Sequence, residues 1–195
     1  MARISTKMLR AGVLEQLGRF EEAAPAYQAS LDAWMRVGGE LHPHTITAMN
    51  NLWLNALRQG KIDRAIELLE ETCRRALITH GPAHPHTIAD RGNLGLAYKA
   101  AGRLDDASAI FEELLAVVRQ SIGSPSIDEC DLLLALGQLR MEQKRPEEAR
   151  RFLAETLAQA QGLEGATWHV RAAQKDLAKL DQQPESPAPE PTTKD

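Results

Sequence analysis

A period of 42 residues runs through most of this chain and constrains its fold more than any other feature. A short segment that closes on alanine recurs at that spacing as Leu17–Ala23, Gln59–Ala65, Ala101–Ala107 and Gln143–Ala149. A His-Pro turn keeps the same period, because Leu41–Ile46 returns as Ala83–Ile88, and a third copy has decayed to Pro125–Ile127. Two markers in one register predict an array of similar units rather than a domain built around one central core.

Each unit of the period predicts a pair of antiparallel helices. Gly18, Gly60 and Gly102 fall where a helix has to end, since glycine adopts the left-handed conformation after a helix at little cost. The acids that follow suit the first turn of a new helix. Thr45 and Thr87 follow the His-Pro turn and are expected to cap the next helix. The predicted pairs are 4–17 with 20–37, 45–58 with 62–79, 87–100 with 104–121, and 128–142 with 146–161.

The expected fold is therefore an all-α solenoid over residues 1–181. Its repeats are predicted at about 4–38, 45–80, 87–122 and 128–162. A last helix at about 165–181 is expected to cap the array, because an apolar face runs along it. That face consists of Val170, Ala173, Leu177 and Leu180. Residues 182–195 are rich in Pro and Glu and are expected to be disordered.

Composition and motifs argue against several kinds of function. The formal net charge is −4, from 23 basic and 27 acidic residues, and no basic stripe is present, so no nucleic-acid partner is expected. No signal peptide is evident, and no apolar run reaches the roughly 18 residues that span a bilayer, so no membrane partner and a cytoplasmic location are expected. No phosphate-binding loop, nucleophile motif or metalloprotease motif occurs, and no enzyme activity is expected.

The histidines are the residues that could form a metal site. His42 and His44 form a His-x-His pair, as do His84 and His86, with His80 close by in sequence. A structural zinc site requires four converging ligands, and no cysteine or carboxylate cluster accompanies these pairs. The histidines are assigned to the repeated turn, and neither a metal nor a cofactor is expected.

At this point the residues resemble the tetratricopeptide repeat (TPR) family. The core motif of that family is whole in the third unit, as Leu94, Gly95, Tyr98, Gly102, Ala107 and Phe111. A 42-residue unit with His-Pro in its long turn is similar to the kinesin light chain type of repeat. The resemblance implies a right-handed solenoid of antiparallel helix pairs over about residues 4–161. It also implies a non-catalytic protein–protein interaction module whose partner is a protein or peptide of unknown identity.

The resemblance places the ligand groove on a concave face lined by the first helix of each pair. The predicted peptide-binding residues are Asn51, Leu54, Arg58, Asn93, Leu96, Lys99, Leu134 and Gln138. Asn51 and Asn93 share one register position, and a side-chain amide can pair with a peptide backbone through both its donors and its acceptor. The alternative is that these asparagines merely tolerate a half-exposed helix position.

A second hypothesis is a structural element that associates with itself. The first unit has Arg10 and Ala11 where the family motif has Leu-Gly, and no N-terminal cap precedes it. An apolar end is then expected to be exposed through Met8, Val13, Leu14 and Leu17. Such an end could stack on another copy of the chain or on a missing domain.

Overall fold

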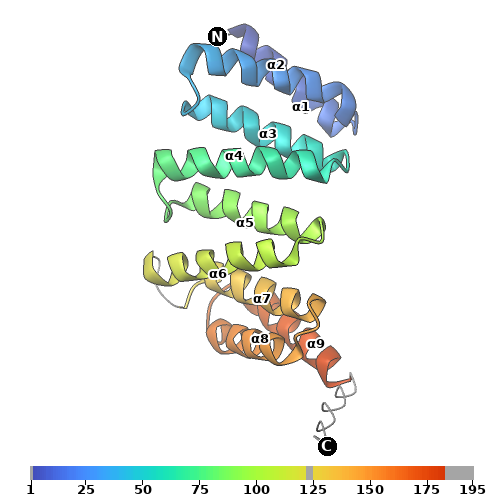
Figure 1. The fold of residues 1–195 in the computed structure, drawn as a ribbon, viewed down its shortest axis with the longest axis vertical. Coiled ribbons are helices and arrows are strands. Elements are labelled where there is room, and N and C mark those ends of the chain that lie inside the picture. Colours follow the sequence, from blue (N-terminus) through green and yellow to red (C-terminus); the bar gives the residue numbers. More distant parts are fainter. Residues whose placement is uncertain (1, 122–124, 183–195) are drawn as a thin grey trace, which may run out of the picture. The chain divides into compact units, whose positions relative to one another are not determined.

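The structure, a computed structural model, describes residues 2–121 and 125–182. Every regular element within these ranges is an α-helix, so the predicted all-α fold of paired helices is confirmed (Figure 1). The chain divides into two compact units, residues 1–123 and residues 124–195, which we describe separately. The predicted disordered tail lies outside the described residues from position 183 onward.

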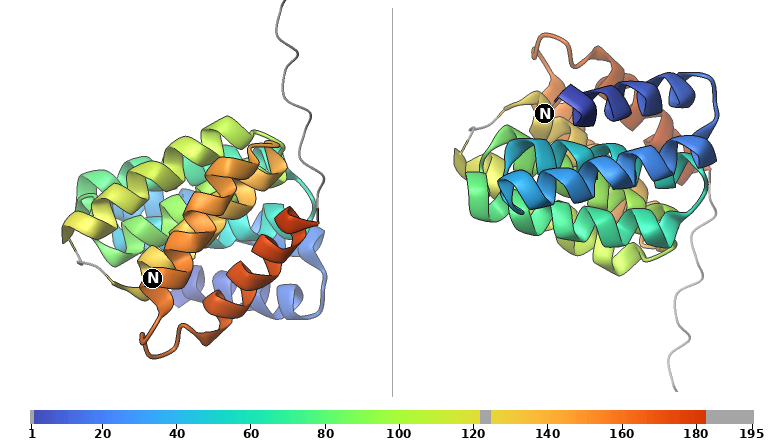
Figure 2. Two further views of the ribbon diagram at one scale, coloured as in Figure 1. Left: turned by 90° about the horizontal axis from the view of Figure 1, so that it is seen from below. Right: turned by 90° about the horizontal axis from the view of Figure 1, so that it is seen from above.

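The first unit is a stack in which each helix packs against the next one in the chain (Figures 1 and 2). Its helices are α1 (Ala2–Gln16), α2 (Phe20–Gly38), α3 (Pro43–Arg58), α4 (Ile62–His80), α5 (Pro85–Ala100) and α6 (Leu104–Ser121). The repeated alanines Ala23, Ala65 and Ala107 have no exposed surface, as expected of small residues between closely packed helices. The predicted helix boundaries agree with these to within two residues.

The second unit contains α7 (Ile127–Glu142), α8 (Pro146–Ala160) and α9 (Thr167–Asp181). Helices α7 and α8 form a pair, and α9 packs against both of them. One buried cluster of the unit contains Leu134, Ala149, Leu153, Ala173 and Leu180, with Leu177 packed against it. Val170, the remaining residue of the apolar face predicted for the last helix, packs against a second cluster, so this face is turned inward.

The turn between the two helices of a pair repeats with the same geometry. Gly60 has a φ of 73°, a left-handed conformation, and its N–H donates to the Leu57 carbonyl at 2.9 Å. The next residue, Lys61, donates to the Ala56 carbonyl at 3.0 Å. In the second unit Lys144 occupies the glycine position and still adopts a φ of 58°. The register of the helices therefore determines the turn even where glycine is absent.

The His-Pro turn corrects one prediction. Helix α3 begins at Pro43 rather than Thr45, because proline is favourable in the first helical position. The cap is His42, whose Nδ1 accepts the backbone N–H of His44 at 3.2 Å. Thr45 is instead buried in the first turn, where its hydroxyl donates to the Gly39 carbonyl at 2.8 Å. Helix α5 begins in the same way, so the prediction that both threonines are caps was wrong.

Candidate functional site

Six of the predicted site residues lie at the surface of the first unit. We call them the α3/α5 face, which consists of Asn51, Leu54, Arg58, Asn93, Leu96 and Lys99. Leu96 is 53% exposed, although it is a large apolar residue. Asn51, Leu54 and Asn93 are half-buried. Both helices thus turn these residues away from the core, which binding to a partner requires.

The two asparagines in the shared register position have unused hydrogen-bonding groups. No described residue forms a hydrogen bond with the side-chain amide of Asn51 or Asn93. Other asparagines of α3 are engaged, since Asn50 accepts the Trp53 Nε1–H at 3.1 Å and Asn55 donates to a backbone carbonyl of α2 at 3.1 Å. The amides of Asn51 and Asn93 therefore keep both their donors and their acceptor without a partner among the described residues.

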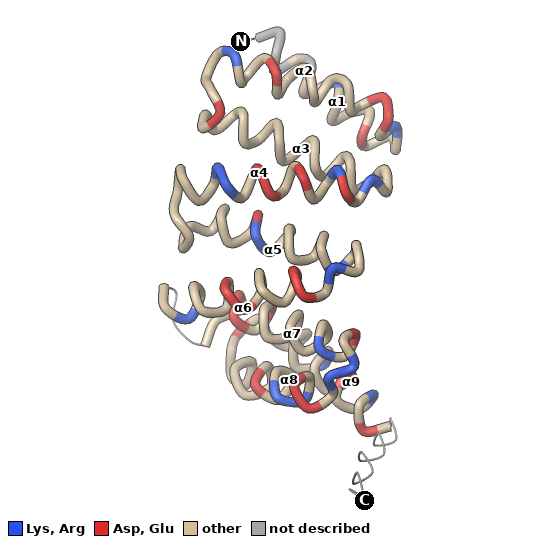
Figure 3. The backbone as a smooth tube through the Cα atoms, viewed as in Figure 1, with Lys and Arg blue, Asp and Glu red and all other residues tan. Residues whose placement is uncertain are grey.

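The side chain of Arg58 contacts residues of α1 and α2. Its Nη1 lies 3.5 Å from Glu15 Oε1, and its guanidinium carbon lies 5.9 Å from the centre of the Phe20 ring. The second oxygen of Glu15 accepts the Tyr27 hydroxyl at 2.9 Å. Because Arg58 is the charged residue of α3 (Figure 3), the α3 part of the face otherwise offers uncharged groups.

The second unit corrects the predicted set. Leu134 is only 3% exposed because it packs in the same core as Ala173 and Leu180 of α9. Gln138 donates from Nε2 to Asp176 Oδ2 at 3.0 Å, again on α9. These two residues are occupied within their own unit and do not line an open groove. The candidate site is therefore confined to the α3/α5 face.

A pocket of about 170 Å³ adjoins the α3/α5 face. It is lined by Pro43, Ile46, Thr47, Asn50, Ala76, His80, His86 and Asp90. Asn50 directly precedes Asn51, and Asp90 lies one helical turn before Asn93. The pocket thus lies at the end of the face where α3 and α5 begin. Among the described residues, no group of three or more His, Cys, Asp and Glu side chains is arranged to hold a metal ion.

Asp90 was not predicted as a site residue. The repeat offered a signal, because Asp90 occupies the register position of Ala48 and Leu132, both of which are buried and apolar. Packing alone would be satisfied by an apolar residue at this position, so the acid indicates a role other than packing.

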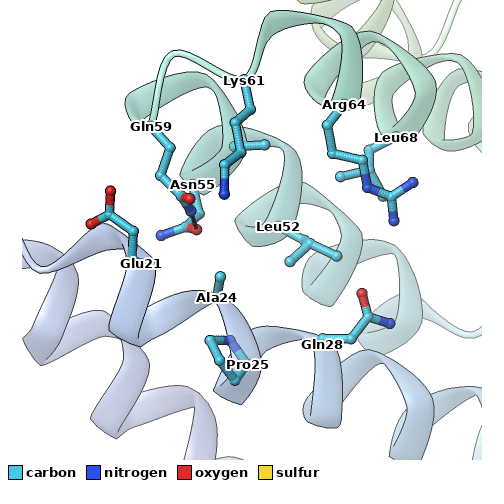
Figure 4. A pocket seen from close by; sticks show the side chains of 11 residues that line it. Glu21, Ala24, Pro25, Gln28, Leu52, Asn55, Gln59, Lys61, Arg64 and Leu68 are labelled. Atoms are coloured by element: carbon cyan, nitrogen blue, oxygen red, sulfur yellow. Dashed lines mark hydrogen bonds between the residues drawn. The ribbon is translucent and has the colours of Figure 1, made fainter.

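A larger pocket of about 320 Å³ lies between α2, α3 and α4 (Figure 4). One wall comes from α2, the opposite wall includes Lys61 and Arg64, and Leu52 of α3 lies between them. Arg64 is paired with Glu67 at 2.7 Å, and the Asn55 amide is bonded to the backbone of α2. None of its lining residues was predicted, and Arg64 and Asn55 are already engaged within the fold.

Sequence comparison assigns the family. One sequence model described as tetratricopeptide repeat matches residues 3–78 and 54–120, and a second with the same description matches residues 93–164. The chain belongs to the tetratricopeptide repeat family. No match is found among curated proteins. Tetratricopeptide repeats are in general modules of protein–protein interaction, and no enzyme family is indicated for this TPR chain.

Solved structures show the same fold. A protein of Podosopora anserina, described as a kinesin light chain with nearly identical TPR-like repeats, is 23% identical with a TM-score of 0.76, over 92% of the TPR chain and 86% of its own. BtubC (BKLC) from P. vanneervenii is 17% identical with a TM-score of 0.70, over 98% and 86%. The apo form of RapI is 12% identical with a TM-score of 0.67, over 92% and 70%. At these identities the likeness concerns the fold of the TPR chain.

None of its described helices is both long and apolar enough to cross a membrane.

Proposed function

We propose that this TPR chain is a non-catalytic module whose α3/α5 face binds a peptide segment of a partner protein. The observation that carries the proposal is the pair Asn51 and Asn93. The two residues share one register position in successive repeats, they are half-buried, and no described residue forms a hydrogen bond with their side chains.

Apolar residues accompany the asparagines in the same register. Leu54 and Leu96 follow Asn51 and Asn93 by three residues each, and Leu96 is more than half exposed. A face that combines exposed apolar side chains with free amides suits a segment that pairs its backbone and inserts apolar anchors. Because both elements are helices packed in a stack, little ordering is required on binding, which favours affinity.

The test is binding to the Asn51→Ala/Asn93→Ala double variant. Peptides selected from a random display library on the wild-type chain are expected to bind the variant roughly 30- to 100-fold more weakly. Each hydrogen bond that is lost contributes about 1 kcal/mol, and the two amides form several. Fluorescence anisotropy with labelled peptides measures the change.

Gln120→Ala/Gln174→Ala provides the matched control, because it removes two exposed helical amides from other parts of the chain. This control should leave the affinity unchanged. Equal affinity of the wild type and the asparagine variant would remove the α3/α5 face as the binding site.

Self-association through α1 is a second candidate, and a separate observation favours it. Leu9 and Val13 of α1, and Leu17 directly after it, are spaced by four residues, and they are 72%, 50% and 64% exposed. The register position of Val13 is occupied by Asn55 and Ala97 in the next two repeats, where it is 0% and 4% exposed. An apolar stripe is therefore open at a position that stacking covers elsewhere, and a second copy of the chain could cover it.

Val13→Glu is expected to keep the chain monomeric at concentrations where the wild type associates, because a charge in this stripe would lose its hydration on stacking. Analytical ultracentrifugation over a range of concentrations measures the mass. Ile78→Glu, at a 59% exposed apolar residue of α4, is the control and should associate like the wild type. A wild type that stays monomeric at every concentration excludes this second function.

A further inference from the structure

Asp90 is a buried acid without a partner. It is 6% exposed, and no described residue forms a hydrogen bond or an ion pair with its carboxylate. A buried carboxylate is unfavourable unless a cation or a hydrogen-bond donor compensates for the water that it has lost. The fold of the described residues supplies no hydrogen bond or ion pair to this carboxylate, which lines the pocket between α3, α4 and α5.

The repeat shows that packing does not require this acid. The same register position holds Ala48 in the preceding repeat, at 0% exposed, and Leu132 in the following one, at 7% exposed. The neighbouring Arg91 also replaces an apolar residue, but its guanidinium is paired with Glu113. Of these two charged substitutions in α5, only Asp90 lacks a counter-ion among the described residues.

The pocket in front of Asp90 has the polarity that suits a cation. Its polar lining consists of Thr47, Asn50, His80, His86 and Asp90, and no Lys or Arg is among its lining residues. The ring centres of His80 and His84 are 4.5 Å apart. Burial, together with the neighbouring histidines, lowers the pKa of His84 below its usual value, which disfavours positive charge on His84 beside the pocket.

The pocket also has room and apolar walls for a side-chain stem. Its volume of about 170 Å³ is several times the roughly 30 Å³ that one water molecule occupies in the liquid. Pro43, Ile46 and Ala76 provide apolar surface beside the carboxylate. Lysine and arginine combine a hydrocarbon stem with a charged end, and they bury the stem along such surfaces.

We propose that this pocket receives the side chain of a lysine or arginine of the bound peptide, with Asp90 as its counter-ion. The inference rests on the proposed function, because the pocket adjoins the α3/α5 face one helical turn from Asn93. A peptide whose backbone pairs with Asn51 and Asn93 has a neighbouring side chain at the mouth of the pocket. The pocket thereby selects partners that carry a basic residue next to their apolar anchors.

The first test uses a small cation rather than a peptide. N-acetyl-arginine amide is titrated into the full chain and followed by amide NMR, with N-acetyl-citrulline amide as the neutral probe of the same shape. Saturable shifts at Thr47, Asn50 and Asp90 are expected with the arginine probe alone. They should disappear in Asp90→Asn and persist in Asp63→Asn, which removes an exposed acid of α4. Equal shifts from citrulline, or unchanged shifts in Asp90→Asn, overturn the proposal.

The second test uses the selected peptides and separates the two proposals. Replacement of their basic residue by citrulline should weaken binding about tenfold in the wild type, as 1.4 kcal/mol is a factor of ten, and little in Asp90→Asn. Peptides that need Asn51 and Asn93 but neither a basic residue nor Asp90 overturn the cation pocket and leave the proposed function intact. Peptides that bind the Asn51→Ala/Asn93→Ala variant as tightly as the wild type, while arginine amide still binds at Asp90, overturn the proposed function instead.

A third measurement checks that the carboxylate is unpartnered. Burial raises the pKa of Asp90, while His86 and His80 act in the opposite direction, and the Asp90 charge in turn raises the pKa of the Cys73 thiol. The folded state then favours the protonated acid, so the ionised form destabilises the fold at neutral pH, and this effect is relieved as the pH falls through the raised pKa. Asp90→Asn should raise Tm by about 2–4 °C at neutral pH, with a smaller gain in acid. A lower Tm for the variant would reveal a stabilising bond to Asp90 and overturn the proposal.

Discussion

Gly95→Ala should lower the free energy of unfolding of the first unit by about 2 kcal/mol, while Gly92→Ala on the same helix should raise it by up to about 1 kcal/mol. Both variants gain the same helix propensity. A methyl group on Gly95 would lie 2.5 Å and 2.8 Å from ring carbons of Phe111, a core residue that is 2% exposed. A methyl group on Gly92 meets nothing within 4 Å. The difference between the variants therefore isolates the steric contact between α5 and α6.

Urea unfolding followed by circular dichroism measures both changes. Gly95→Ala should be better tolerated in a Phe111→Leu background, since the smaller side chain leaves room for the methyl group. Equal stability of Gly95→Ala and Gly92→Ala would mean that α5 and α6 are not packed as closely at Gly95 as the structure shows.

Leu153→Ala should destabilise the second unit by about 3 kcal/mol. Leu153 has no exposed surface, and it packs with Leu134 of α7 and Ala173 of α9. It also fills the space left by Gly137, where an added methyl group would lie 2.8 Å from Leu153 Cδ2. The truncation leaves a cavity at the point where three helices meet, and packed neighbours relax only partly into such a cavity.

Amide hydrogen exchange over α7, α8 and α9 reports on this unit directly. Leu157→Ala is the matched control, because Leu157 lies one turn further along α8 and is only partly buried. Its cost should be about 1 kcal/mol. Similar costs for the two variants would contradict the central position of Leu153 in this core.

The two glycines of α5 also bear on the candidate site. Gly95 belongs to the family motif and lies under Phe111, whereas Gly92 lies half-exposed beside Asn93. The motif therefore reports on helix packing, and it carries no information on what the α3/α5 face binds. This is why the family assignment predicted the fold in detail but its site only by projection of the register.

Local signals were sufficient to predict the helices. A glycine that can adopt positive φ after three of the four first helices, and acids in the next first turn, act within one repeat. The 42-residue period repeats these signals along the chain, so the helices could be predicted without knowing what lies beside them. The positions of half-buried Asn51 and Asn93 and of exposed Leu96 on the first helices follow from the same register. Even the mistaken threonine caps concern a shift of two residues within one turn.

The tertiary structure decided which of the predicted site residues are occupied by contacts between helices. Leu134 and Gln138 are occupied because α9 packs against α7, a contact between two separate helices. Asp90 forms no hydrogen bond or ion pair with the side chains that α3 and α4 place around it, although His80 of α4 favours its ionised form. The sequence alone determined which helices form, whereas burial and charge compensation depend on the neighbours that folding brings to each face.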